Sequence, residues 1–315
     1  LYVREELDTL ITKLHRLIEN ITLVAKEEAE TIMPGLTHLQ SAQPISLGHH
    51  LMSWAHMLHR DSTRLFDSRK RANVLPLGSG ALAGTTFPID RERVAQLLQF
   101  DSLSENSLDA VSDRDFIIEL NFCASMILMH FSRICEELVL WNSQAFNFIA
   151  LPDAFCTGSS MMPQKKNPDV PELIRGKSGR VFGNLVSLLT LMKSQPLAYN
   201  KDNQEDKEPL FDTIDTLHNC IRALTELMPQ IEFNREKLEE ATSEGFITAT
   251  DVADYLVKKG ISFRDAHEIV GNLVSFAIKN NKTLEQLSME ELANISEEFD
   301  PDVYRIFNNM HSINS

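Results

Sequence analysis

A polar loop from Gly158 to Pro168 carries the residue types with the clearest chemical potential in this chain of 315 residues. It reads Gly-Ser-Ser-Met-Met-Pro-Gln-Lys-Lys-Asn-Pro, a mixture too apolar for a solvated tail and too irregular for a helix. Its end, Asn167-Pro168-Asp169, predicts a helix N-terminus with proline in the first turn. The loop therefore brings hydroxyls, an amide and ammonium groups to a helix N-terminus, where anions bind.

Such a loop suits a carboxylate substrate, and it also suits a carbanion whose charge spreads into a carboxylate. The alternative is a surface loop with incidental lysines, and the spacing alone leaves both interpretations open.

Two further polar segments could contribute to a site: 35–44, which contains Thr37 and His38, and 199–208, which begins at Tyr199. A lone histidine is often a buried, hydrogen-bonded one, but the uncharged Thr-His-Leu-Gln run favours a function for His38. The alternating charges of 201–208 are typical of a solvated helix face. A group of histidines follows on one predicted helix without a supporting carboxylate motif, so we predict no metal site there: His49, His50, His56 and His59.

Helical periodicity dominates the segments that must position these loops. It predicts helices to about residue 31, from about 44 through 65, and over 113–150, 169–194, 204–228, 249–259 and 263–280. Apolar residues cover most of the circumference of 113–150, which indicates burial on several sides. Gly176, Gly179 and Gly183 share a face that would let another backbone approach closely. We therefore expect an all-α bundle of long helices, extended by other subunits.

The composition of the chain limits the partners and the cell compartment that can be expected for it. A hydrophobic fraction of 43% and a charged fraction of 24% are ordinary for a globular protein, and the net charge of −15 disfavours nucleic acid and anionic membranes as partners. The four cysteines lack a C-x-x-C motif, which favours free thiols and a reducing compartment. We expect no signal peptide, and neither uncharged stretch, 31–59 or 72–89, is typical of a membrane span.

The pattern Gly-Ser-Ser-x-Met-Pro-x-Lys-x-Asn-Pro resembles the signature loop of the fumarase/aspartase superfamily. The variant here, Gln164 to Asp169, is more similar to the argininosuccinate lyase family than to its relatives. Segments 37–40, 75–85, 107–115, 199–210 and 251–271 match that family too, so the resemblance covers essentially the whole chain.

The resemblance implies a fumarase/aspartase-type bundle. Because the predicted helices become shorter after about residue 232, we expect the bundle over 1–232 and a small C-terminal helical domain over 233–315. The resemblance implies the reversible elimination of fumarate from argininosuccinate to give arginine, as part of arginine biosynthesis in the cytoplasm. The proton next to a carboxylate is removed and the C–N bond to the guanidino nitrogen breaks. No metal or other cofactor is implied.

The resemblance also implies roles for individual residues. Ser159 is the expected base, and its alkoxide needs stabilisation by Lys165, loop amides or a helix terminus. Lys165 and Asn167 are expected to hold the carboxylate, and His38, backed by Glu172, to act as acid or electrostatic partner. Glu172 could instead be a first-turn acid favoured by the helix dipole. The remaining expected substrate contacts are Thr37, Ser160, Tyr199, Gln204 and Lys207.

In this superfamily each site is built from three subunits of a homotetramer. Helical periodicity begins almost at Leu1, and the resemblance implies that an N-terminal segment with further substrate contacts is absent, together with the C-terminal tail. We therefore expect the 315-residue polypeptide alone to release no fumarate from argininosuccinate. The alternatives are a lyase for adenylosuccinate, aspartate or fumarate, a structural protein similar to lens crystallins, and a plain helical oligomerisation module.

Overall fold

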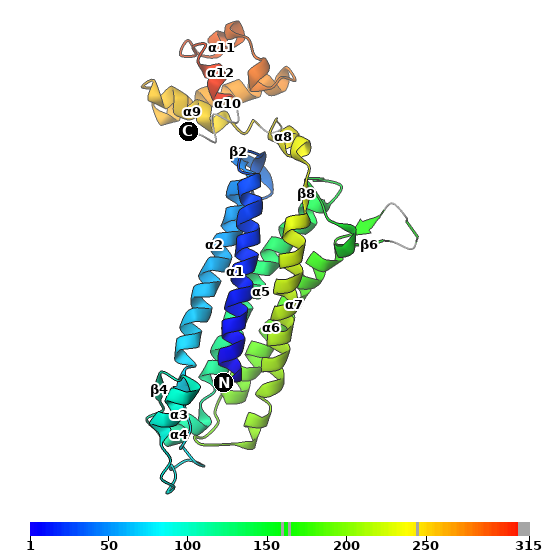
Figure 1. Ribbon diagram of the computed structural model, residues 1–315. Coiled ribbons are helices and arrows are strands. Elements are labelled where there is room, and N and C mark those ends of the chain that lie inside the picture. Colours follow the sequence, from blue (N-terminus) through cyan, green and yellow to red (C-terminus); the bar gives the residue numbers. More distant parts are fainter. Residues whose placement is uncertain (159–160, 163–164, 244–245, 308–315) are drawn as a thin grey trace. The chain divides into compact units, whose positions relative to one another are not determined.

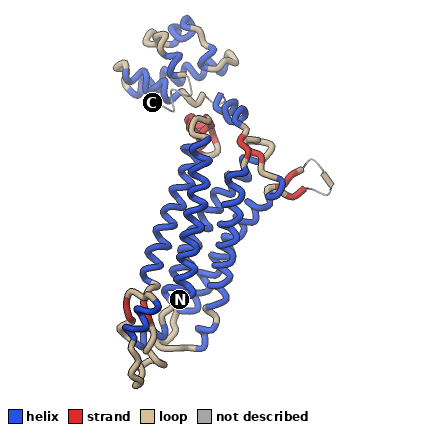
Figure 2. Tube along the Cα trace, viewed as in Figure 1, coloured by secondary structure: helices blue, strands red, loops and turns tan. Residues whose placement is uncertain are grey.

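The structure is a computed structural model that describes residues 1–158, 161–162, 165–243 and 246–307 (Figure 1). The chain divides into two compact units. The first comprises 1–22, 53–146 and 151–232, and the second comprises 23–52, 147–150 and 233–315. The described chain is mainly helical, which confirms the predicted all-α class (Figure 2).

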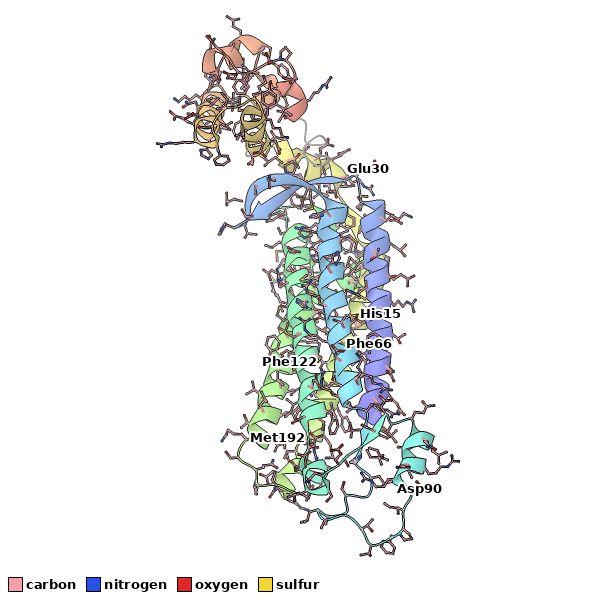
Figure 3. All side chains as sticks on the ribbon, turned by 90° about the vertical axis from the view of Figure 1, so that its left-hand side faces the viewer. His15, Glu30, Phe66, Asp90, Phe122 and Met192 are labelled. Atoms are coloured by element: carbon pink, nitrogen blue, oxygen red, sulfur yellow. The ribbon has the colours of Figure 1, made fainter. Side chains whose placement is uncertain are left out.

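Five long helices lie side by side in the bundle of the first unit (Figures 1 and 3). They are α1 (Tyr2–Glu27), α2 (Leu47–Arg71), α5 (Asp115–Asn142), α6 (Asp169–Met192) and α7 (Lys207–Leu227), and the first two continue into the second unit. Side chains link neighbouring helices: His15 of α1 and Phe66 of α2 have ring centroids 6.3 Å apart, and both are labelled in Figure 3. Trp54 of α2 stacks on Trp141 of α5 at 5.5 Å.

Helix α5 forms the centre of this bundle. Leu120, Ala124, Ile127 and Phe131 are fully buried, whereas Phe122 on another face is 48% exposed. The expected helix over 113–150 was too long at both ends, because α5 begins at Asp115, after the short helix α4 (Ser107–Ser112), and ends at Asn142. The next residue, Ser143, is in an extended conformation.

Among the described helices, α5 is long and apolar enough to cross a membrane, as judged by length and composition alone. Its most apolar 18 residues have a mean hydropathy of 1.3. Of that window, 61% is buried inside the bundle. A helix at the core of a helical bundle has the same composition, because neighbouring helices cover it on several sides.

A hydrogen-bonded pair of titratable side chains, Asp61 and His130, is buried between α2 and α5. The carboxylate of Asp61 lies 2.6 Å from Nδ1 of His130 and 2.9 Å from Arg64, and the Asp61 side chain is fully buried. Burial raises the pKa of Asp61, and the contacts with His130 and Arg64 oppose this shift. The bundle therefore contains a desolvated carboxylate that depends on its two partners.

Shorter elements connect the long helices of the first unit. Strands β3 (Val74–Leu75) and β4 (Ser102–Leu103) pair in parallel around α3 (Arg91–Leu98). Asp90 caps α3 by accepting a hydrogen bond from the Arg93 amide.

A β-hairpin in the second unit lies between α1 and α2. Strands β1 (Ile32–Thr37) and β2 (Gln40–Ser46) are antiparallel, with a register shift between Gly35 and Leu36. The expectations that the first helix reaches residue 31 and the second begins near Pro44 were therefore wrong by about one turn each. Pro34 pairs with Pro44, which is possible because both strands of an isolated hairpin are edge strands.

The C-terminal part of the second unit packs around its own apolar cluster. The helices of this part are α8 (Arg235–Ser243), α9 (Ala249–Lys258), α10 (Phe263–Lys279), α11 (Met289–Ile295) and α12 (Val303–Ile306), and the cluster is formed by residues from α9 onward. Leu256, Leu273, Leu292 and Phe307 are fully buried in this cluster. The predicted helices 249–259 and 263–280 are confirmed to within one residue.

Gly48, in the first turn of α2, is closely packed. A Cβ atom there would lie 2.5 Å from the Ala25 carbonyl oxygen and 2.8 Å from the Ala29 Cα atom. We expect Gly48→Ala to lower the free energy of unfolding by about 1–3 kcal/mol, because backbone must move to admit the methyl group. Urea unfolding measures this change.

Gly271 provides the matched control, since it lies in α10 and a methyl group added there would meet no heavy atom of a neighbouring segment within 4 Å. Gly271→Ala should raise the free energy of unfolding by up to about 1 kcal/mol, the ordinary helix preference for alanine. If Gly48→Ala behaves like Gly271→Ala, the close packing of α1 against α2 is wrong.

Candidate active site

The predicted residues Thr37 and His38 lie at the tip of the β1–β2 hairpin. Thr37 pairs with Gln40, so His38 and Leu39 form a two-residue turn, with φ angles of 55° and 58°. Two positive φ angles are typical of a type I′ hairpin turn, where Gly or Asn is usual. For histidine and leucine this conformation costs roughly 1–2 kcal/mol each. Such strain at an exposed turn is a feature of functional sites.

The base of this hairpin is anchored by Glu28, whose side chain is 4% exposed. The carboxylate accepts hydrogen bonds from the Thr31 hydroxyl and from the Arg235 guanidinium of α8. Burial alone would raise the pKa of Glu28, but the hydrogen bonds from Arg235 and Thr31 hold this pKa below its usual value. Glu28 thus fixes the end of the hairpin that joins the helices, and the exposed His38 side chain lies at the opposite end, in the turn.

The signature loop has a short β stem in the first unit. Strand β6 (Thr157–Gly158) pairs antiparallel with β7 (Lys166–Asn167). The predicted residues Ser159 and Ser160 lie outside the described residues. The Lys165 amide donates to the Met162 carbonyl oxygen at 2.9 Å, and the Lys165 side chain is exposed.

The two adjacent lysines of the loop differ in their surroundings. The Lys166 ammonium is ion-paired with Asp153, and this hydrogen bond raises the pKa of Lys166. Lys165 makes no such pair with a described carboxylate. Of the two, Lys165 is therefore the ammonium available to a ligand.

Helix α6 begins directly after the loop, at Asp169. The expectation of Pro168 in the first turn was wrong: Pro168 is the N-cap residue, and the first-turn proline is Pro171. Asn167 thus lies two residues before the helix and is half-buried. Glu172 lies in the first turn of α6 and is 45% exposed. Its carboxylate lies 3.9 Å from the Arg175 guanidinium, a long distance for an ion pair.

The third predicted segment follows the other end of α6. Tyr199 is 53% exposed and Gln204 is also exposed. The Lys207 side chain is 57% exposed, and its ammonium contacts an oxygen of Asp206 at 2.5 Å. The alternating charges of this segment are typical of a solvated helix face, but the structure agrees only in part, because Asn203 and Asp206 are buried. Asp206 was not predicted, since an acid in an alternating charge run gives no sequence signal of burial.

Within one chain, the predicted site residues of the first unit lie in two groups at opposite ends of α6. Asn167 and Glu172 lie at the start of α6, whereas Tyr199, Gln204 and Lys207 follow its end (Figure 1). Helix α6 has 24 residues, which at about 1.5 Å per residue separates the two groups by roughly 36 Å. No group of three histidine, cysteine or acidic side chains within the described residues is arranged to hold a metal ion.

The four cysteines are free thiols, as predicted. Cys123, Cys135 and Cys220 are buried, and burial raises the pKa of Cys123 to about 12 and that of Cys220 to about 11. Cys156, just before β6, is partly exposed. We expect iodoacetamide at neutral pH to modify Cys156 first, because a thiol must reach solvent to react. Peptide mass spectrometry checks this, and earlier labelling of Cys135 would contradict the packing of α5.

Comparison with known proteins defines the class. The family described as Lyase matches residues 1–183, and the family described as Argininosuccinate lyase C-terminal matches 246–314. A crystal structure of EDDS lyase in complex with formate superposes with a TM-score of 0.90 at 30% identity, over 99% of this chain and 64% of that one. A class II fumarase from Schistosoma mansoni has the same fold, with a TM-score of 0.81 at 20% identity over 96% and 65%. The fold and the polar loop thus define a lyase of the fumarase/aspartase type.

The closer relatives identify the family. The argininosuccinate lyase of Nitrosococcus oceani is 61% identical over 97% of this chain and 66% of its own length. That of Pseudomonas aeruginosa is 60% identical over 100% of this chain and 68% of its own length. The chain belongs to the argininosuccinate lyase family, and it spans about two thirds of the length of these relatives.

Proposed function

We propose that this protein is an argininosuccinate lyase, which converts argininosuccinate into arginine and fumarate in the cytoplasm without a metal or other cofactor. The observation that carries the proposal is the identity of about 60% to argininosuccinate lyases along almost the whole chain. A fumarate-bound variant of EDDS lyase, with a TM-score of 0.90 at 29% identity, supports the same type of product.

In the proposed reaction the Ser159 alkoxide takes the proton from the carbon next to a carboxylate. The electron pair left on that carbon becomes the C=C bond of fumarate as the C–N bond breaks. The carbanion character needs positive groups around the carboxylate. The exposed Lys165 ammonium, the Asn167 amide and the start of α6 are suited to this role.

The departing guanidino nitrogen needs a proton, because neutral guanidine groups leave more readily than anionic ones. We propose that His38 supplies this proton or stabilises the charge that develops, and that Glu172 orients its imidazole. The exposed, strained turn supports a functional role for His38. The exposure of Thr37, Tyr199, Gln204 and Lys207 is consistent with the proposed substrate contacts, which also include Ser160.

We further propose a homotetramer whose sites are shared between subunits. The separation of Glu172 from Lys207 along α6 supports this, because the helix rises roughly 30 Å from Glu172 to its end at Met192, and a small substrate cannot span that distance. Gly176, Gly179 and Gly183 face open space within the chain, and large apolar residues on α5 and α6 are exposed: Phe122, Leu173, Phe182, Val186 and Leu189. A second copy of α6 could approach closely there. In this assignment 1–232 assembles and 233–315 is the small domain.

The assembly predicts a particle mass near four times the mass of one chain. Light scattering after size exclusion measures it. Gly179→Leu should reduce the tetramer, because the added side chain would fill the space left for the approaching helix. A wild-type mass equal to one chain would contradict the assembly.

A substrate panel tests the proposed activity. The purified protein at its full natural length is offered argininosuccinate, adenylosuccinate, aspartate and malate, and fumarate is followed by its ultraviolet absorbance. We expect fumarate from argininosuccinate, with arginine in equal amount. Fumarate from one of the other three compounds instead would assign the protein to a different lyase of this fold.

A further inference from the structure

Asp206 directly precedes α7, and its carboxylate joins two cations. Nε of Arg114 donates to Oδ2 at 2.5 Å, and Nζ of Lys207 lies 2.5 Å from Oδ1. The Asp206 side chain is 1% exposed, compared with 15% for Arg114 and 57% for Lys207. A carboxylate removed from water in this way depends on its cationic partners.

The helix does not need this carboxylate as a cap. Aspartate is among the favoured N-cap residues, where its side chain accepts a hydrogen bond from the first turn. Asp206 occupies the N-cap position of α7, yet it makes no side-chain cap hydrogen bond. Its two oxygens are directed at Arg114 and Lys207 instead.

The Lys207 ammonium is held at two points. Besides the contact with Asp206, it donates to the main-chain carbonyl oxygen of Asn203 at 3.2 Å. An ammonium has three N–H donors, so these two contacts leave one donor for a ligand. Because the side chain is 57% exposed, that donor can reach a ligand from solvent.

Arg114 connects this arrangement to another part of the bundle. Its Nη1 donates to the carbonyl oxygen of Asp113 at 2.6 Å, in the turn that precedes α5. The chain Arg114–Asp206–Lys207 therefore ties the start of α7 to the start of α5.

We infer that Asp206 is a positioning residue, which fixes the Lys207 ammonium with one N–H free for a substrate carboxylate and is itself held by Arg114. This inference rests on the proposed function, because it takes Lys207 as a substrate contact. Asp206 need not touch the substrate, since it acts through Lys207.

The test is a double-mutant cycle on the protein at its full natural length. Asp206→Asn keeps the shape but removes the charge. We expect kcat/KM for argininosuccinate to fall by about 10- to 100-fold, mainly through KM, as for loss of a charged hydrogen bond to the substrate. Lys207→Met should have a similar effect. The double variant should be no worse than Lys207→Met alone, because Asp206 then has no ammonium to position.

Asp202→Asn is the control, since Asp202 is an exposed acid in the same segment. It should leave KM unchanged. If the two losses in kcat/KM multiply in the double variant, or if Asp206→Asn lowers the melting temperature without changing KM, Asp206 is merely structural and the inference is wrong.

Fumarate binding separates this inference from the proposed function. A wild-type protein that releases no fumarate from argininosuccinate refutes the proposed function. Calorimetric titration with fumarate then still tests whether Asp206 positions Lys207. Asp206→Asn and Lys207→Met should weaken fumarate binding to the same extent. Equal fumarate affinity of Asp206→Asn and wild type, or no binding to either, overturns the inference.

Discussion

Ser159→Ala should lower kcat for fumarate release by about 10²- to 10⁴-fold, the usual contribution of a general base. The substitution removes the group proposed to take the proton but leaves Lys165, Asn167 and the start of α6 in place. KM should therefore change little, because these groups bind the substrate in the ground state as well. Initial rates of fumarate formation over a range of argininosuccinate concentrations give both constants.

Ser275→Ala is a suitable control for this variant, since Ser275 is an exposed serine on α10. It should retain wild-type kinetics. A Ser159→Ala protein with at least half of the wild-type kcat would show that another residue is the base.

Asp61→Ala should destabilise the protein by about 3–5 kcal/mol, the usual cost of removing one partner from a buried ion pair. His130 and Arg64 would lose the carboxylate that faces them at 2.6 and 2.9 Å. This cost is a large fraction of a typical stability of about 5–15 kcal/mol. Urea unfolding followed by circular dichroism measures the change.

Asp67→Ala on the same helix is the matched comparison. Asp67 pairs with Lys70 in an exposed contact, with side chains 55% and 73% exposed. Its loss should change stability by less than about 1 kcal/mol, because exposed ion pairs contribute little. The Asp61→Leu/His130→Leu double variant should recover much of the loss, since apolar residues can replace a buried pair. Equal effects of Asp61→Ala and Asp67→Ala would contradict this burial.

The helices could be predicted where local signals coincide with their ends. The start of α10 follows from the cap Ser262, and the end of α9 follows from Gly260, which has a φ of 98°. The hairpin between α1 and α2 could not be predicted in this way. Pro34, Gly35 and Pro44 indicate a break in a helix, but pairing of two short strands depends on contacts across the hairpin.

The candidate site shows the same limit. The Gly-Ser-Ser loop and the Thr-His-Leu-Gln run could be selected from their unusual composition and from the family resemblance. The buried polar pairs could not be predicted in this way, because Asp61 and His130 are 69 positions apart in sequence, and Asp206 and Arg114 are 92 positions apart. Only a fold brings such partners together, because a charge in sequence looks the same whether it is solvated or buried.

We propose that the signature loop and the hairpin turn surround one dicarboxylate, although one chain holds the signature loop apart from Lys207 by the length of α6. The crystal structure of Ser159→Ala at full natural length with argininosuccinate tests it most directly. We expect a carboxylate of the substrate within hydrogen-bond distance of Lys165 and Asn167, with His38 and Lys207 contributed by neighbouring subunits. A bound substrate that contacts neither Lys165 nor His38 of any subunit would contradict the account.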